Sequence, residues 1–331
     1  MKRLLILILV VAALWSGYWL IGAAYVRNGI ETWFAEREAD DWQADYGDFR
    51  VTGFPNRFDM IWTDLALADP RTGWALTLPE FAFMALSYNP LHMIAVAPND
   101  MQLATPLTNV TITDSDLRAS LKLRSRKRLE VVRSQLSGDD LLVTGPESVS
   151  LGHLNLAMEQ AEDDRNTYRL GALAQDLTPP EALKGRIASG VALPEMMQEA
   201  RLDATVTFSK PWDITAIEDS RPQPRHIQLD QLKAQWGELA IQATATLEVD
   251  EAGLPTGELA LQAKNWQALL RLAVETGVLD ERLAQGTEAA LKLLSGMSGN
   301  PASLDVTVAF RDGRTFLGPI PVGPAPVIQL R

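Results

Sequence analysis

Most of the chain alternates between hydrophobic and polar positions, which is the pattern of strands that bury one face. In the first clear run, Phe58, Met60 and Trp62 fall on one face and polar or mixed positions on the other. Similar short runs continue as far as residue 310, separated by turn residues such as Asn89-Pro90. We therefore predict a mainly β (α+β) fold, a curved and largely antiparallel sheet, over residues 46–331. Residues 179–200 are where two strand-rich halves would meet.

A few short helices interrupt this pattern. Pro179-Pro180 is typical of a helix start, and a second short helix is predicted from Pro194 to Ala200. The clearest helix begins at Asn265 and ends at Gly277, and another runs from Asp280 to Leu294. The tail from Leu317 to Pro326 is rich in Gly and Pro, so we predict an extended closing segment rather than a central strand.

The N-terminus departs from the alternating pattern. Lys2 and Arg3 precede an uncharged hydrophobic run from Leu4 to Val26, which is long enough to cross a bilayer as a helix. Four aromatic residues crowd the far part of this run, where such rings favour the membrane boundary: Trp15, Tyr18, Trp19 and Tyr25. We predict a membrane anchor over residues 1–27, with the N-terminus in the cytoplasm and the main domain in the periplasm.

A cleaved signal peptide is the alternative interpretation, because Gly22 and Ala24 would supply small residues at a cleavage site. The run is longer than the usual signal core, and both interpretations export the chain. After the anchor, Ile30, Trp33 and Phe34 predict an amphipathic connecting helix within residues 28–45. This helix would either lie on the membrane or cap the first sheet.

Composition narrows the function further. The chain has 42 acidic and 30 basic side chains, a formal net charge of -12, so its field repels polyanions and argues against nucleic-acid binding. It contains no cysteine, which removes disulfides, thiolate metal sites and thiol nucleophiles.

The chain carries no recognisable catalytic motif. Its three histidines, His92, His153 and His226, lie far apart and have no partner at zinc-ligand spacing. Nucleophile-elbow, phosphate-loop and dinucleotide fingerprints do not occur in the sequence. We therefore predict that the protein is not an enzyme and needs neither cofactor nor metal; a titratable cluster gathered by loops is the third-ranked alternative.

Two groups of residues are candidates for binding. Lys122, Arg124 and Arg126 share one face if they lie on a strand, either as an ordinary wet face or as a contact for anionic lipid head groups. Large apolar side chains would line an apolar groove if the sheet left one face uncovered, and would otherwise fill a core. The candidates for this groove are Trp62, Phe81, Phe83 and Trp236.

Three stretches carry a family resemblance. They are the segment from Gly53-Phe54-Pro55-Asn56-Arg57 to Tyr88-Asn89-Pro90, the segment from Trp236-Gly237-Glu238 through Gly253 and Gly257 to Asn265-Trp266, and the closing Gly318-Pro319-Ile320-Pro321. Together they resemble, over nearly the whole chain, an alphaproteobacterial family catalogued as domain of unknown function 2125. The second stretch also resembles a strand-turn-strand-helix unit of AsmA-like envelope proteins. That resemblance implies an inner-membrane anchor, a β-rich periplasmic domain and a role with lipids, and it supplies no catalytic residues.

The leading hypothesis is a non-enzymatic, single-pass inner-membrane protein of the cell envelope, held by residues 4–26, that binds or helps to transfer lipid on a curved β-sheet. The alternative is a scaffold or interaction module of an envelope complex with a filled core and no ligand. Neither hypothesis names a protein partner.

Overall fold

A computed structural model describes residues 1–182, 184, 193–275, 288, 291–292, 295–296 and 302–330. The chain is mostly antiparallel β-sheet, with few helices and one long apolar helix at the N-terminus, as predicted. It divides into two compact units. Unit 1 comprises residues 1–126 and 136–146, and unit 2 comprises residues 127–135 and 147–331. Residues 179–200 therefore fall within unit 2, and the last of them belong to a strand that begins at Met197.

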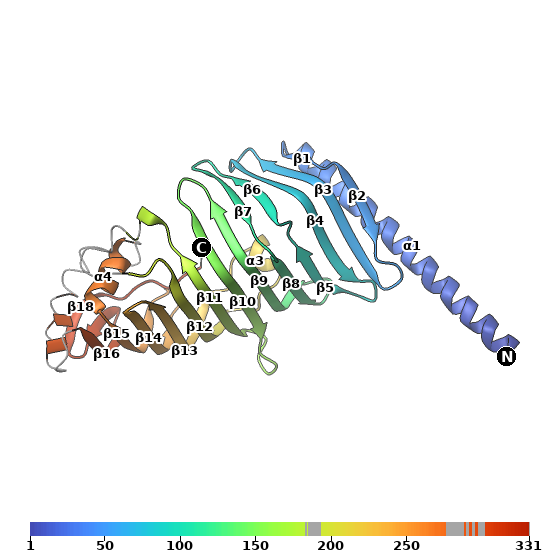
Figure 1. Cartoon of the computed structure of the whole chain (residues 1–331). Helices are drawn as coiled ribbons and strands as arrows, with labels where there is room; N and C mark the ends of the chain where they lie inside the picture. The colour runs from blue at the N-terminus through green and yellow to red at the C-terminus, as the bar shows by residue number, and fades with distance from the viewer. Residues whose placement is uncertain are drawn as a thin grey trace. The chain divides into compact units, whose positions relative to one another are not determined.

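Unit 1 consists of one helix and the N-terminal strands (Figure 1). These elements are α1 (Lys2–Ala39), β1 (Gln43–Asp45), β2 (Asp48–Thr52), β3 (Arg57–Asp69), β4 (Trp74–Leu86), β5 (Asn89–Val96), β6 (Asp100–Ala104), β7 (Asn109–Thr113), β8 (Arg118–Arg124) and the second part of β9 (Glu130–Thr144). Strand β4 pairs with β3 along its whole length on one side, and with both β5 and β6 on the other. The sheet therefore branches at β4 and is not a simple meander.

The core of unit 1 lies between its sheet and the second half of α1. The predicted alternation holds: Phe58, Met60 and Trp62 are all buried. Phe34 on α1 packs edge-on against Tyr46, with ring centroids 4.7 Å apart. This contact ties the helix to the aromatic side of the sheet.

Helix α1 is continuous from Lys2 to Ala39, so the predicted anchor and the first part of the connecting helix form one element. The helix ends at Ala39, and the residues that follow turn back to form β1 (Gln43–Asp45) instead of extending the helix to residue 45. Asp41, which adopts a positive φ of 65°, lies in this turn. The first 15 residues are exposed, and the N-terminal part of α1 projects beyond the strands in Figure 1.

Unit 2 is an antiparallel meander in which each strand pairs with the next from β10 to β18. Its elements are β10 (Val149–Gln160), β11 (Thr167–Thr178), β12 (Met197–Phe208), α3 (Thr215–Glu218), β13 (Pro224–Trp236), β14 (Leu239–Val249), β15 (Pro255–Lys264), α4 (Trp266–Glu275), β16 (Ser303–Arg311), β17 (Arg314–Leu317) and β18 (Ile320–Pro324). Figure 1 shows β10 to β16 side by side.

The predicted helices of unit 2 had mixed outcomes. The helix predicted from Asn265 is α4, whose end at Gly277 lies outside the described residues. The helix predicted over Pro194–Ala200 is wrong, because β12 begins at Met197 and pairs with strands on both sides. Pairing of this kind overrides local helix propensity. Most of the helix predicted over Asp280–Leu294 lies outside the described residues. The closing segment forms the short strand β18, which pairs with β17.

Candidate functional site

The register of unit 2 places apolar side chains in three continuous rows across seven strands, β10 to β16. Residues that pair across neighbouring antiparallel strands point to the same face of the sheet. The first row is Leu154, Ala174, Ala200, Ala234, Ile241, Ala263 and Leu304. The second row is Leu156, Ala172, Leu202, Leu232, Ala243, Leu261 and Val306, and the third is Met158, Leu170, Ala204, Leu229, Ala245, Leu259 and Val308. These three rows are called the apolar face below.

The middle of the first row is built from alanines and is only half-buried. In the first row, three successive strands contribute Ala174, Ala200 and Ala234, and all three are only half-buried. Leu156 at the β10 side retains 39% of its exposure. If other side chains packed onto this face, the three alanines and Leu156 would be buried. Because they are partly exposed, the alanine row forms a shallow trough in the sheet.

Helix α4 covers one part of the apolar face and leaves a cavity beneath it. Trp236, Leu239 and Ala268 form a buried cluster with Met197 and Leu272 packed against it. Beside this cluster lies a cavity of about 440 Å³ with an almost entirely apolar lining. The residues that line it include Leu177, Met197, Ala234, Trp236, Ile241 and Leu272. The cavity thus continues the first row of the apolar face.

Trp236 contributes only its apolar ring to this cavity. Its indole Nε1 donates a hydrogen bond of 2.8 Å to the carbonyl oxygen of Pro194, and the side chain is 4% exposed. Because the indole N–H already has a backbone acceptor, the part of the ring at the cavity needs no hydrogen-bond partner from a ligand.

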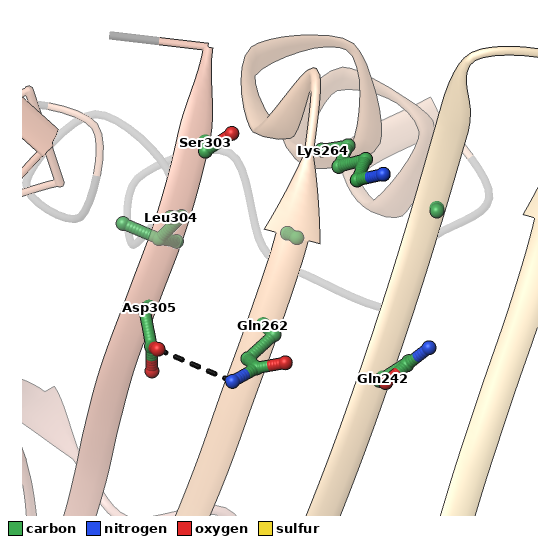
Figure 2. A pocket seen from close by; sticks show the side chains of 8 residues that line it. Gln242, Gln262, Lys264, Ser303, Leu304 and Asp305 are labelled. Atoms are coloured by element: carbon green, nitrogen blue, oxygen red, sulfur yellow. Dashed lines mark hydrogen bonds between the residues drawn. The ribbon is translucent and has the colours of Figure 1, made fainter. Parts of the chain in front are cut away.

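The opposite face of the same strands is polar. A depression of about 340 Å³ lies on β14, β15 and β16. Figure 2 shows Gln242, Gln262 and Asp305, three of the side chains there, in a row. The Gln262 side-chain amide donates to the Asp305 carboxylate at 3.2 Å, and both residues are exposed. Exposed groups of this kind are well solvated, so this depression lacks the desolvated polar groups that hold a specific polar ligand.

A buried polar network closes the β10–β12 end of the apolar face. The Glu130 carboxylate, 1% exposed, accepts hydrogen bonds from the Arg165 guanidinium, at 2.9 Å from Nε, and from the Gln160 amide at 2.8 Å. Tyr168 is fully buried, and its hydroxyl accepts from Gln160 and from the backbone N–H of Trp212. A buried carboxylate that is paired by a guanidinium fork is a structural element rather than a reactive group.

The predicted groove residues fall into different units. Trp62, Phe81 and Phe83 lie in unit 1, where Trp62 contacts the Phe81 ring with centroids 5.7 Å apart. There they belong to a cluster that also contains Phe34 and Phe49, and Trp62 is 6% exposed. Trp236 is the one predicted groove residue that lines the cavity of unit 2.

The predicted cationic patch is only partly on a strand. Lys122 and Arg124 lie on β8, opposite Leu121 and Leu123, as predicted. Arg126 lies beyond the end of β8, because Ser125 adopts a positive φ of 66° and the chain turns there. The expected shared face therefore holds for two of the three side chains.

Titratable groups with a shifted pKa are scattered, not gathered. Burial raises the pKa of Asp114 in unit 1 above its ordinary value, while the Thr167 hydroxyl and the Asn166 N–H lower the pKa of Asp164 in unit 2. Within the described part of the chain, no group of three or more His, Asp or Glu residues could hold a metal ion. Among the described residues, the rows of unit 2 and the cavity beside Trp236 offer a ligand a continuous apolar surface.

The alanine row is the feature that reasoning from sequence missed. Its members lie on strands far apart in the chain, so only the pairing register brings them together. The only trace of it in the sequence is that alanine or leucine occupies alternate positions in several strands. An ordinary hydrophobic core gives the same pattern, so the pattern alone does not identify an exposed row.

These features define a class: a β-sheet protein with one N-terminal helix long and apolar enough to span a membrane, and an apolar sheet face that the described residues cover only in part. Within this class, the chain belongs to the family described as "Uncharacterized protein conserved in bacteria (DUF2125)", whose model matches residues 19–326. Comparison with curated proteins and with solved structures gave no match.

Proposed function

We propose that this protein is a non-enzymatic, membrane-anchored protein of the bacterial cell envelope that binds lipid on the apolar face of unit 2. The observation that carries the proposal is the three-row apolar face with alanines in its middle. The resemblance to AsmA-like envelope proteins supports the same role.

The chemistry of the site favours an acyl chain. The cavity of about 440 Å³ lies within the range of small-molecule sites, which is roughly 300–1,000 Å³, and continues into an open trough. An acyl chain needs no polar partner and gains free energy over its whole length when it leaves water, at roughly 25 cal/mol per Å² of buried apolar surface. A polar ligand would leave its own groups unpaired here.

Anchoring by α1 is supported by its contacts with the fold. Trp19 is 8% exposed, and its indole Nε1 donates to the Arg57 carbonyl oxygen at 2.7 Å. Cleavage after Ala24 would remove Trp19 and expose the Phe58 ring that stacks on it, so we propose that the leader stays uncleaved. The positive Lys2 and Arg3 support a cytoplasmic N-terminus and a periplasmic main domain. Protease added to spheroplasts should then digest the main domain, and protection of that domain would refute this topology.

The binding test uses the full-length chain in detergent and a fluorescent phosphatidylethanolamine as the probe. Ala234→Phe places a ring in the cavity and should weaken probe binding several-fold. Ala240→Phe is the matched control, because Ala240 lies nearby on the polar face and borders the depression of Figure 2. Circular dichroism checks that both variants keep their strand content. Equal binding by wild type and Ala234→Phe, or no binding at all, would overturn the proposed site.

The second candidate function is a scaffold with no ligand, and the filled aromatic cluster of unit 1 favours it. In that case the purified protein would retain no lipid after gentle extraction, and the alanine row would be covered by a protein partner.

Lys122, Arg124 and Arg126 are proposed as contacts for anionic head groups. Replacing all three by Gln should lower binding to vesicles that contain phosphatidylglycerol, and unchanged binding would remove this role.

A further inference from the structure

The first half of α1 is attached to two hairpin turns of unit 1 by side-chain hydrogen bonds. The turn between β2 and β3 contains Phe54 and Pro55, and the turn between β4 and β5 contains Ser87 and Tyr88. Trp15 Nε1 donates to the Pro55 carbonyl oxygen at 3.0 Å, and the Tyr18 hydroxyl donates to that of Ser87 at 2.6 Å. Both turns are therefore held against the apolar helix.

The helix and these turns also pack tightly. The Trp19 ring lies edge-on to Phe54, with centroids 5.5 Å apart, and stacks on Phe58 at 5.8 Å. A Cβ added at Gly22 would lie 2.6 Å from the Phe58 ring, so glycine allows the close approach of helix and sheet at this position.

These contacts begin too early in α1 for the sheet to lie clear of a membrane. Residues 4–14 form the apolar part of the helix that precedes the first contact at Trp15. At 1.5 Å per residue they cover only about 17 Å, roughly half of the ~30 Å hydrocarbon core. If α1 spans the bilayer from Lys2 and Arg3, the hairpin turns must enter its far side.

The turns have the chemistry that this position requires. Phe54 and Tyr88 are 55% and 63% exposed at the tips, and aromatic rings favour the membrane–water boundary. Backbone carbonyls at this depth need hydrogen-bond donors, because lipid offers none. The indole and phenol groups of Trp15, Tyr18 and Trp19 are such donors.

Arg57 follows directly after the β2–β3 turn. Arg57 is about half-exposed and pairs with the buried Asp59 carboxylate at 2.7 Å. Pairing lowers the cost of a charge near lipid, and the long arginine stem lets its head reach the polar head groups.

We infer that the hairpin turns around Phe54 and Tyr88 insert into the far leaflet of the bilayer beside α1, so that the sheet of unit 1 starts below the lipid head groups. The inference rests on the proposed anchoring of α1. It adds a second, β-sheet contact with the membrane, and the partner is the bilayer itself.

The test uses the absence of native cysteine. Phe54→Cys, Tyr88→Cys and Trp74→Cys are each made in the full-length chain, labelled with an environment-sensitive fluorophore and reconstituted in phosphatidylcholine–phosphatidylglycerol vesicles. Trp74 is the matched control, because it is 53% exposed but begins β4, roughly 40 Å along the strand from Leu86 at the other end.

Labels at positions 54 and 88 should be shifted to the blue and quenched by spin-labelled lipid several-fold more strongly than the label at position 74. If the chain floats with the vesicles but all three labels report water, the insertion is refuted while the anchor stands. If the chain does not float with vesicles, the proposed anchoring fails, and the inference fails with it.

Discussion

Both units contain a sheet with one apolar face, but the side chains on that face differ in size between the two units. In unit 1 the register pairs Phe49 with Trp62 and Trp62 with Phe81, and adjacent rings lie 4.8 and 5.7 Å apart. In unit 2 the equivalent cross-strand row runs through alanines, from Ala174 to Ala234. In unit 1 the rings and helix α1 together bury the face, whereas the alanine row of unit 2 stays half-buried. The comparison therefore separates a filled core from a sheet face that the described residues cover only in part.

The largest effect should come from truncating a ring in unit 1. Trp62→Ala removes a buried ring from the aromatic cluster and should cost about 3–5 kcal/mol of unfolding free energy. Leu202→Ala, on the half-exposed second row of the apolar face, should cost less than about 2 kcal/mol, because less buried contact is lost. Denaturant unfolding of both variants measures the difference, and equal costs would contradict the contrast between a filled and an open face.

Adding volume should give a smaller effect, which is again larger in unit 1 than in unit 2. Ala85→Phe inserts a ring into a position that is 8% exposed in unit 1 and should destabilise the protein by about 1–3 kcal/mol. Ala200→Phe enters the half-exposed alanine row of unit 2 and should be close to neutral. Thermal unfolding without added lipid checks this pair. A strongly destabilised Ala200→Phe variant would mean that the trough is already full.

The smallest expected effect is a difference in acid response between two carboxylates. Burial raises the folded-state pKa of Asp114 above 3.8, so protonation stabilises the fold as the pH falls through that pKa. Hydrogen bonds from Thr167 and Asn166 lower the folded-state pKa of Asp164, so its contribution is present above pH 3.8 and is lost below it.

The measurement is the unfolding midpoint between pH 3 and 7 for Asp114→Asn and Asp164→Asn. Asp114→Asn should be more stable than wild type at neutral pH and lose this advantage in acid. Asp164→Asn should be less stable at neutral pH and approach wild type in acid. If the two variants gave parallel pH profiles, the pKa values of Asp114 and Asp164 would not be shifted in opposite directions, which would contradict this prediction.

Local patterns predicted the strand-rich fold well, and the pairing register explains what they missed. Alternation of Phe58, Met60 and Trp62 identified β3 and one of its buried faces, because these three positions follow a period of two; the buried Asp59 and Leu65 depart from that period. The helix expected over Pro194–Ala200 is wrong because Met197 pairs with β11, and Glu199 and Ala200 pair with strands on both sides. Local propensity does not contain that information.

The apolar face itself was beyond the reach of a strict period-two pattern. Leu229 and Leu232 are three residues apart, so simple alternation assigns them to opposite sides. A bulge between them restores both to the apolar face, where they pair with Ala204 and Leu202. Bulges of this kind are set by the partner strand, so the rows became visible only with the register.

Helix α1 is continuous from Lys2 to Ala39, so no flexible linker separates the hydrophobic segment from the part of the helix that packs on the strands. A tethered domain on a loose linker would be indifferent to how thick its bilayer is. If α1 spans the bilayer as proposed, a thicker or thinner bilayer must change the tilt of the helix, and the β2–β3 hairpin bonded to Trp15 and Trp19 must lean with it.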